Sequence, residues 1–270
     1  MAFVALLAVS GAGRASEPAE RLVLDARAGR PLVAHVFVAL CDNDHQHIVP
    51  VPRHLGNGAS PNTNLYWGAQ FGVRSYFSRS RDWTRVKHEG SVPAGVLERA
   101  VFVAALPISG QSTRVYVVAD AWDGSRIRET IGAFLEAAAG RRIERIGIDG
   151  RSLAAGGAAH VVVFVGHDGL MDFDPPAVAA GTAEPARAAI VLACTSESYF
   201  GPLLRRAQAY PLLLTTSLMA PEAYTLEAAL RVWFVEGQPD AVVRAAVRAY
   251  DSYQHCGREA ARRLFVGRRP

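Results

Sequence analysis

Cysteine is scarce in this sequence, and the few cysteines form no recognisable pair. The 270 residues include only Cys41, Cys194 and Cys256, which are widely spaced and odd in number. They contain no Cys-x-x-Cys pair and no metal-ligand spacing. A disulfide scaffold is therefore excluded and at least one thiol is free, while a bridge between Cys41 and Cys256 stays open.

Phosphate-binding motifs and long apolar segments are also absent. No Gly-x-Gly-x-x-Gly follows a strand, and no Gly-x-x-x-x-Gly-Lys-[Ser/Thr] loop occurs, so a nucleotide-binding or transferase protein has little support. No segment approaches the length that crosses a bilayer, so we expect no integral membrane segment.

The apolar run from Ala2 to Val9 has the size of a signal-peptide core, with a possible cut after Ala15, although no basic residue precedes it. We therefore expect a signal peptide over residues 1–15 and an exported protein, periplasmic or secreted, with a cytoplasmic location as the alternative.

Lysine is nearly missing as well, because Lys87 is the only one and arginine carries the positive charge. The formal net charge is +4, and residues 240–270 alone contain seven arginines against three acidic residues, 7 − 3 = +4. The rest of the chain is therefore neutral. Nucleic-acid binding needs a basic stripe interleaved with aromatic residues, whereas a basic tail is typical of a solvated helix face. We expect no nucleic-acid partner.

Apolar runs and amphipathic stretches alternate along the chain. Runs of five or six Val, Ile, Leu and Ala without polar alternation are typical of strands buried on both faces of a parallel sheet. Strands are predicted over 32–40, 99–106, 114–121, 161–165, 188–193 and 212–217, and helices over 62–78, 124–139, 219–234 and 240–263, with a further helix entered at 195–197. This order predicts one α/β domain over residues 16–270, a three-layer sandwich with a mostly parallel sheet of about six strands and helices on both faces.

Two consecutive predicted strands end on reactive side chains. The run 161–165 stops at Gly166-His167, and the run 188–193 stops at Cys194. Adjacent parallel strands end at one edge of the sheet, where open α/β sheets place their ligand sites. A neighbouring imidazole can take the proton of a thiol and leave a strong nucleophile. The pair predicts acyl-transfer chemistry; the alternative is that Cys194 is a packing residue and His167 a turn residue.

This arrangement resembles the cysteine peptidases of the caspase-haemoglobinase fold, a group that includes the caspases, legumain, gingipain, clostripain and separase. The matching residues are Gly166-His167 with Gly169, and Ala193-Cys194, each behind its strand. As a strand and helix order, the resemblance runs roughly over residues 32–234. It implies an endopeptidase that uses a His167–Cys194 dyad, needs no cofactor and acts on a peptide or protein.

The sequence departs from that group directly after the histidine. These enzymes usually have glycine there and hold the oxyanion with its backbone N–H, whereas this chain has Asp168 followed by Gly169. The resemblance therefore assigns the oxyanion contact to the Asp168-Gly169 backbone. It leaves a catalytically inactive binding module of the same fold as an alternative.

A long loop over residues 41–64 follows the first predicted strand. Loops of this length in a compact domain are usually functional or disordered. Asp42 and Asp44 would line a substrate pocket at the dyad's edge and favour a basic side chain, and Glu197, Ser217 and Glu222 would face the same edge. The alternative is that the two aspartates only form turns.

Two further roles for polar residues stay open. The loop also carries His45, His47 and His54, and imidazole with carboxylate suits zinc or manganese, so a metal-dependent hydrolase built on residues 42–47 is another alternative. Asp120 and Asp123 lie just beyond a predicted strand end and are candidates to orient His167.

Overall fold

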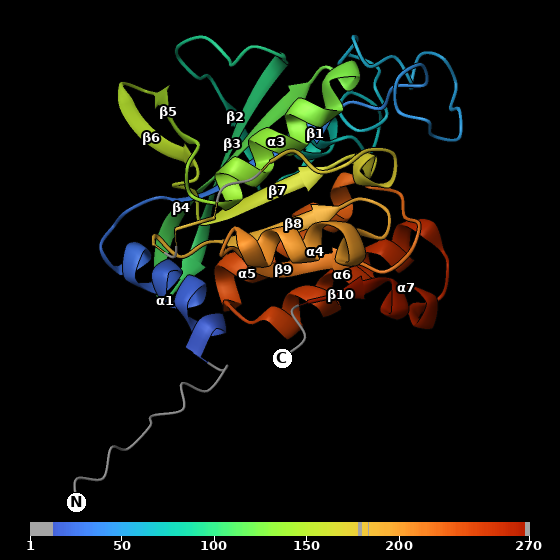
Figure 1. The fold of residues 1–270 in the computed structure, drawn as a ribbon. Coiled ribbons are helices and arrows are strands. Elements are labelled where there is room, and N and C mark those ends of the chain that lie inside the picture. Colours follow the sequence, from blue (N-terminus) through green and yellow to red (C-terminus); the bar gives the residue numbers. More distant parts are fainter. Residues whose placement is uncertain (1–12, 178–179, 183, 268–270) are drawn as a thin grey trace, which may run out of the picture.

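A computed structural model describes residues 13–177, 180–182 and 184–267, so the apolar run at residues 2–9 lies outside the described residues. Strands and helices alternate in parts of the chain, between runs of consecutive strands and a run of consecutive helices near the end of the described residues (Figure 1). The strands are β1 (Leu32–Ala39), β2 (Thr84–Val86), β3 (Val96–Ile108), β4 (Gln111–Trp122), β5 (Ile143–Ile148), β6 (Arg151–Gly156), β7 (Val161–Val165), β8 (Ala188–Leu192), β9 (Tyr210–Thr215) and β10 (Phe265–Val266). The helices are α1 (Gly13–Arg27), α2 (Val73–Arg79), α3 (Ile127–Ala138), α4 (Ser196–Arg206), α5 (Ala223–Glu236), α6 (Pro239–Gln254) and α7 (Arg258–Leu264), with short 3₁₀ turns η1 (Gly124–Arg126) and η2 (Gly169–Met171).

Eight strands form one mixed sheet in the order β10-β9-β8-β7-β1-β4-β3-β2, and β5 pairs with β6 in a separate hairpin. The five central strands β9, β8, β7, β1 and β4 are parallel, whereas β10, β3 and β2 run antiparallel to their neighbours. The expected α/β class and mostly parallel sheet are confirmed. The expected count of about six strands is wrong, because β2 and β10 are only three and two residues long and leave no apolar run in the sequence.

Helices cover both faces of the sheet, as the layered prediction required. Alternate residues of β1 and β7 enter two different apolar clusters, since successive side chains of a strand point to opposite faces. One cluster includes α1, α2, α5, α6 and α7; the other includes α3, α4 and the β5–β6 hairpin (Figure 1). Every residue of β1, β7 and β8 is buried, which explains why these strands are apolar apart from His35 of β1.

The helix expected over residues 62–78 is largely wrong, because only α2 forms there. The side chain of Asn64 clamps the end of β1: its Oδ1 accepts the N–H of Cys41 at 3.0 Å and its Nδ2 donates to the Cys41 carbonyl at 2.8 Å. Gly68 lies so close to the backbone of Asn62 that an added Cβ would be 2.0 Å from a carbonyl oxygen. Residues 64–72 therefore turn tightly on the sheet edge, and the helix begins only at Val73.

The helix expected over residues 240–263 is divided into α6 and α7. His255 ends α6 in the left-handed region at φ 51°, and Gly257 follows at φ 87°. The Asp251 carboxylate accepts the Gly257 N–H at 2.8 Å and holds this turn. None of the described helices combines the length and apolar character that a membrane span requires.

Candidate active site

The carboxyl ends of β7 and β8 bring His167 and Cys194 to one edge of the sheet. In the parallel register Val165 pairs with Leu192, and His167 and Cys194 each follow two positions later. The Gly166 N–H donates to the Leu192 carbonyl at 3.2 Å, which extends the pairing up to the histidine. Neighbouring strands are about 4.8 Å apart. The two side chains therefore belong to neighbouring strand ends, as the sequence predicted.

Strand order makes this edge a natural ligand site. β1 has β4 on one side and β7 on the other, so the chain reverses its direction of winding between β1 and β7. In doubly wound sheets ligands bind in the crevice at such a switch point, outside the carboxyl ends of the strands. Gly166 is needed there, because at its φ of 153° an added Cβ would be 2.9 Å from the Ala39 carbonyl oxygen at the end of β1.

His167 is held by a carboxylate. Its Nε2 lies 2.6 Å from Oδ2 of Asp172, and the two side chains are 13% and 28% exposed. The 3₁₀ turn η2 returns the chain so that a residue five positions later meets the ring. Because a carboxylate only accepts, Nε2–H is the donor and Nδ1 is left as the basic nitrogen. A carboxylate that fixes the tautomer and orientation of histidine is a recurring element of nucleophilic catalysis.

The prediction that Asp120 or Asp123 orients His167 is wrong. Asp120 is fully buried on β4, and Asp123 caps η1 by accepting the N–H of Ser125 at 2.9 Å. Asp172 was visible in the sequence as an acidic residue just after Gly169, but only the turn geometry shows that it reaches the ring.

The Cys194 thiol lies half-buried against the loop that follows β9. Its Sγ is 3.4 Å from the Met219 backbone nitrogen and 3.8 Å from the Met219 carbonyl oxygen. An N–H group that points at sulfur stabilises negative charge on that atom, and so does the amino end of α4, which begins two residues later. Among the described residues no hydrogen bond joins His167 directly to Cys194. Catalytic contacts are often long in proteins without bound substrate.

Asp168 is buried in the turn that carries His167. Its Oδ1 accepts the Leu170 N–H at 3.1 Å, whereas Oδ2 is buried without a hydrogen-bond partner among the described residues. Burial, with a smaller contribution from Asp172, raises the pKa of Asp168 to about 7. The carboxyl therefore carries a proton over part of the physiological pH range.

Two backbone N–H groups of this turn are already engaged. Gly169 N–H donates to the His167 carbonyl at 3.1 Å, and Met171 N–H donates to the Asp168 carbonyl at 3.1 Å. Among the described residues the Asp168 N–H makes no hydrogen bond. The oxyanion role expected for the Asp168-Gly169 backbone stays a prediction, in which Gly169 would have to release its bond and Asp168 would not.

Three of the predicted pocket residues belong to segments at the Cys194 end of the edge. Glu197 lies in the first turn of α4, the backbone carbonyl of Ser217 accepts the Thr195 N–H at 3.0 Å, and Glu222 directly precedes α5 without a side-chain capping bond. Burial, together with Cys41, Cys194 and Glu222, raises the pKa of Tyr66 well above its usual value. Met219, whose backbone contacts the Cys194 thiol, lies three residues before Glu222 in the loop that joins β9 to α5.

Glu222 is fixed on one side only. Its Oε2 accepts the Tyr224 hydroxyl at 2.8 Å and the Gln254 amide at 2.9 Å. Among the described residues Oε1 accepts no hydrogen bond. The half-buried carboxylate thus keeps an oxygen that a cationic substrate group could contact.

Asp42 and Asp44 line a different hollow, at the ends of β1 and β4. This cavity of about 470 Å³ is lined also by His45, Arg53 and Asp123, and by neither His167 nor Cys194. Asp42 is buried, and its carboxylate accepts hydrogen bonds from the Asp44 N–H and from His45 Nδ1 within the loop, each at 2.9 Å. Asp42 therefore stabilises the loop turn, and only the exposed Asp44 is free to meet a ligand.

The metal alternative finds no support in the 42–47 loop, because His45 is already bonded to Asp42. In the part of the chain that the structure describes, one group has ligand atoms close enough for a metal, namely His35, Asp120 and Glu144. The Arg99 guanidinium lies against these ligand atoms and donates hydrogen bonds to the carboxylates of Asp120 and Glu144. Although burial opposes it, hydrogen bonds from Arg99 and His35 hold the pKa of Asp120 below its usual value. The cluster is therefore a buried ion-pair network.

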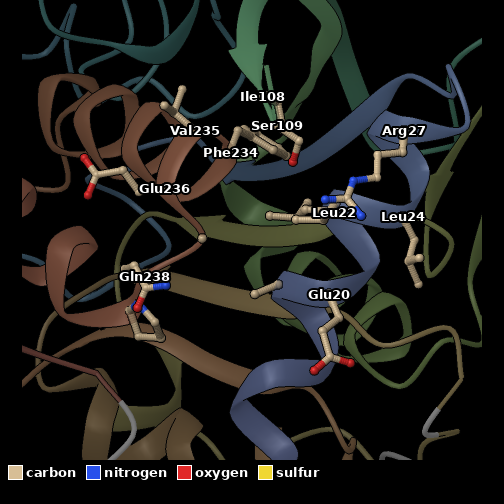
Figure 2. Close-up of a pocket in the computed structure, with 14 residues that line it drawn as sticks. Glu20, Leu22, Leu24, Arg27, Ile108, Ser109, Phe234, Val235, Glu236 and Gln238 are labelled. Atoms are coloured by element: carbon tan, nitrogen blue, oxygen red, sulfur yellow. The ribbon is translucent and has the colours of Figure 1, made fainter. Parts of the chain in front are cut away.

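A second cavity, of about 660 Å³, lies near the amino end of β4, between α1, the β3–β4 turn and the end of α5 (Figure 2). Its walls are mainly apolar and include Leu22, Ile108, Phe234 and Val235. None of the predicted site residues lines it, so its size does not bear on the dyad.

No family model, curated protein or solved structure matches this chain in the three comparisons. The function must therefore be argued from the site itself.

Proposed function

We propose that this chain is a cysteine-dependent hydrolase, and specifically an endopeptidase, with Cys194 as the nucleophile and His167 as the general acid and base. The observation that carries the proposal is the register of β7 and β8, in which both residues follow a paired position by two places. The resemblance to the caspase-haemoglobinase peptidases rests on the same two residues and their strands.

The proposed reaction uses side chains alone. The Cys194 thiolate attacks the carbonyl carbon of the scissile amide, and His167 donates a proton to the leaving amine as the C–N bond breaks. A thioester remains on Cys194. Water then attacks the thioester carbonyl and gives one proton to His167, and the C–S bond breaks to release the thiolate and a carboxylic acid, which loses its remaining proton to solvent. Asp172 acts on His167 as a positioning residue, through the 2.6 Å contact at Nε2.

The proposed substrate carries a basic side chain near the cleaved bond. Glu222 supports this proposal better than Asp42 of the 41–64 loop. Among the described residues Glu222 Oε1 accepts no hydrogen bond, whereas the Asp42 carboxylate already accepts hydrogen bonds from the loop. A cation that pairs with a half-desolvated carboxylate contributes more to binding than one at an exposed surface.

A second candidate is an inactive binding module that uses the same edge. It is favoured by the Gly169 N–H, which is bonded within the turn and so cannot hold an oxyanion as it stands, and by Asp168 in the position where the resembling peptidases have glycine. This module would still bind a peptide at the carboxyl edge.

A peptidase assay separates the two candidates. Purified protein is incubated with a quenched fluorescent peptide library that contains arginine, leucine or glutamate at each position, beside Cys194→Ala and Glu222→Gln. The endopeptidase proposal expects turnover that Cys194→Ala abolishes, and a preference for arginine that Glu222→Gln reduces about tenfold or more in kcat/KM without affecting leucine peptides. Binding without turnover would favour the inactive module.

A further inference from the structure

A groove that neither His167 nor Cys194 lines collects four arginines from two helices. Arg244 and Arg248 are four residues apart on α6, and Arg258 and Arg262 are four apart on α7, so each pair lies on one face of its helix. All four are exposed and line a single cavity of about 770 Å³ at the β10 edge of the sheet. We call it the arginine groove.

The floor of the arginine groove is apolar. Val243 and Val247 of α6 and Phe265 and Val266 of β10 line it beneath the guanidinium groups. Val247 and Phe265 are buried, and Val243 and Val266 are half-buried. The groove therefore offers an apolar contact surface with positive charge along its rim.

The arginines have almost no partners of their own. Within the described residues Arg244, Arg248 and Arg258 make no hydrogen bond or ion pair, and Arg262 meets only Glu259, at 3.8 Å, with both side chains 75% exposed. Such an exposed ion pair contributes little to the free energy of unfolding. Among the described residues that line the groove, Asp240, at the start of α6, is the only acidic one. The described part of this segment, residues 240–267, contains five arginines against three acidic residues, 5 − 3 = +2.

We propose that the arginine groove binds an acidic segment of a partner protein that also carries apolar side chains. Guanidinium groups bind carboxylates through paired N–H donors, and two helices that present them across one groove can hold successive acidic residues. The apolar floor accommodates the side chains between those residues. The volume of the groove, about 770 Å³, lies within the range of about 300–1,000 Å³ that is usual for ligand pockets.

Other anionic partners fit the groove less well. Single-stranded nucleic acid is bound by stacking its bases on exposed aromatic rings, and the two rings that line the groove, Phe265 and Tyr210, are only 2% and 8% exposed. A helix that lies on a membrane presents its apolar face outward, whereas Val247 is buried and Val243 is half-buried in the lining of a cavity.

The arginine groove borders a second cavity. Gln238 and Pro239, which join α5 to α6, line both the arginine groove and the apolar cavity of Figure 2. A bound segment can therefore extend from the arginines toward an apolar cavity. A partner segment with acidic residues at one end and leucine-like residues at the other matches this order.

The test measures fluorescence anisotropy of a labelled 12-residue peptide of glutamate and leucine with the full chain. The proposal expects binding that weakens with salt, and a Kd at least tenfold higher for the Arg248→Glu/Arg258→Glu variant. Arg205→Glu/Arg206→Glu changes the net charge equally, at exposed positions on α4, and should leave the Kd unchanged. Circular dichroism confirms that both variants are folded.

Competing probes give the outcomes that overturn the proposal. Equal Kd values for the two double variants would show non-specific attraction to a basic protein. Equal binding of a glutamate-only peptide would show that the apolar floor is not used. In a third outcome the natural chain binds oligo-dT or phosphatidylserine vesicles but not the peptide. If Arg248→Glu/Arg258→Glu then lost that binding, the groove would be assigned to nucleic acid or to membrane.

Discussion

The Nε2 atom of His167 lies 2.6 Å from Oδ2 of Asp172, a residue only five positions further along the chain. The contact is local, and it depends on the single 3₁₀ turn η2. It gives the proposed base a defined tautomer, with Nδ1 available to take a proton. The first prediction follows from it.

Replacing Asp172 by asparagine removes the acceptor charge from His167 and keeps the side-chain shape. We expect the reaction rate at Cys194 to fall about tenfold or more, because an unoriented imidazole is a poorer base. The rate of iodoacetamide alkylation of Cys194 measures this change. Asp174→Asn is the control, since the Asp174 side chain makes no hydrogen bond among the described residues. An equal effect of the two substitutions would contradict a positioning role for Asp172.

The buried carboxyl of Asp168 predicts a pH dependence of stability. Its pKa is about 7 in the folded protein, whereas an exposed aspartate has a pKa of about 3.9. Between these values the folded state retains a proton that the unfolded state has lost, so this group makes the free energy of unfolding fall as pH rises from about 4 to 7. Above pH 7 its contribution is constant.

Asp168→Asn tests that dependence, because the amide can still accept the Leu170 N–H and never ionises. We expect the variant to lose the decline between pH 5 and pH 7.5 and to gain stability on the order of a few kcal/mol at pH 8. Urea unfolding at the two pH values measures it. A variant with the same pH dependence as the natural protein would show that Asp168 is ionised and solvated in the folded state.

The ion-pair network around Arg99 predicts a large loss of stability. Arg99→Ala leaves Asp120 fully buried without its guanidinium partner, which costs about 3–5 kcal/mol. The control is Arg85→Ala, because Arg85 is 49% exposed in its pair with Glu98 and such a pair contributes about 0–1 kcal/mol. Urea unfolding of both variants gives the comparison. Similar losses for the two would mean that water reaches Asp120.

Central strands were predictable from sequence because both of their faces are buried. β1, β7 and β8 are buried at every position, so an apolar run, interrupted only by His35 in β1, marks each of them within one residue of its end. The same property placed His167 and Cys194 at the sheet edge, because each is the first reactive residue after such a run. Edge elements leave no equivalent pattern: β10 has two residues and is defined by its pairing with β9.

Contacts made by turns were not predictable. Asn64 reads as a helix cap, but its amide bonds both backbone groups of Cys41, a contact across 23 positions. Met219 meets Cys194 through its backbone, so the identity of its side chain carries no signal. Asp172 was one of several acids near a strand end, and nothing in its spacing separates it from Asp120.

The central claim is that His167 activates Cys194, and alkylation by iodoacetamide at pH 6.5 tests it most directly. At this pH an ordinary thiol, with a pKa of about 8.5, is mostly protonated and reacts slowly. The exposed Cys256 of the same molecule is the internal reference. The account predicts that the half-buried Cys194 is labelled faster than Cys256, and that His167→Ala removes this difference without changing the rate at Cys256. Labelling of Cys194 that is no faster than that of Cys256, or that His167→Ala leaves unchanged, would contradict the dyad and leave the binding module as the better account.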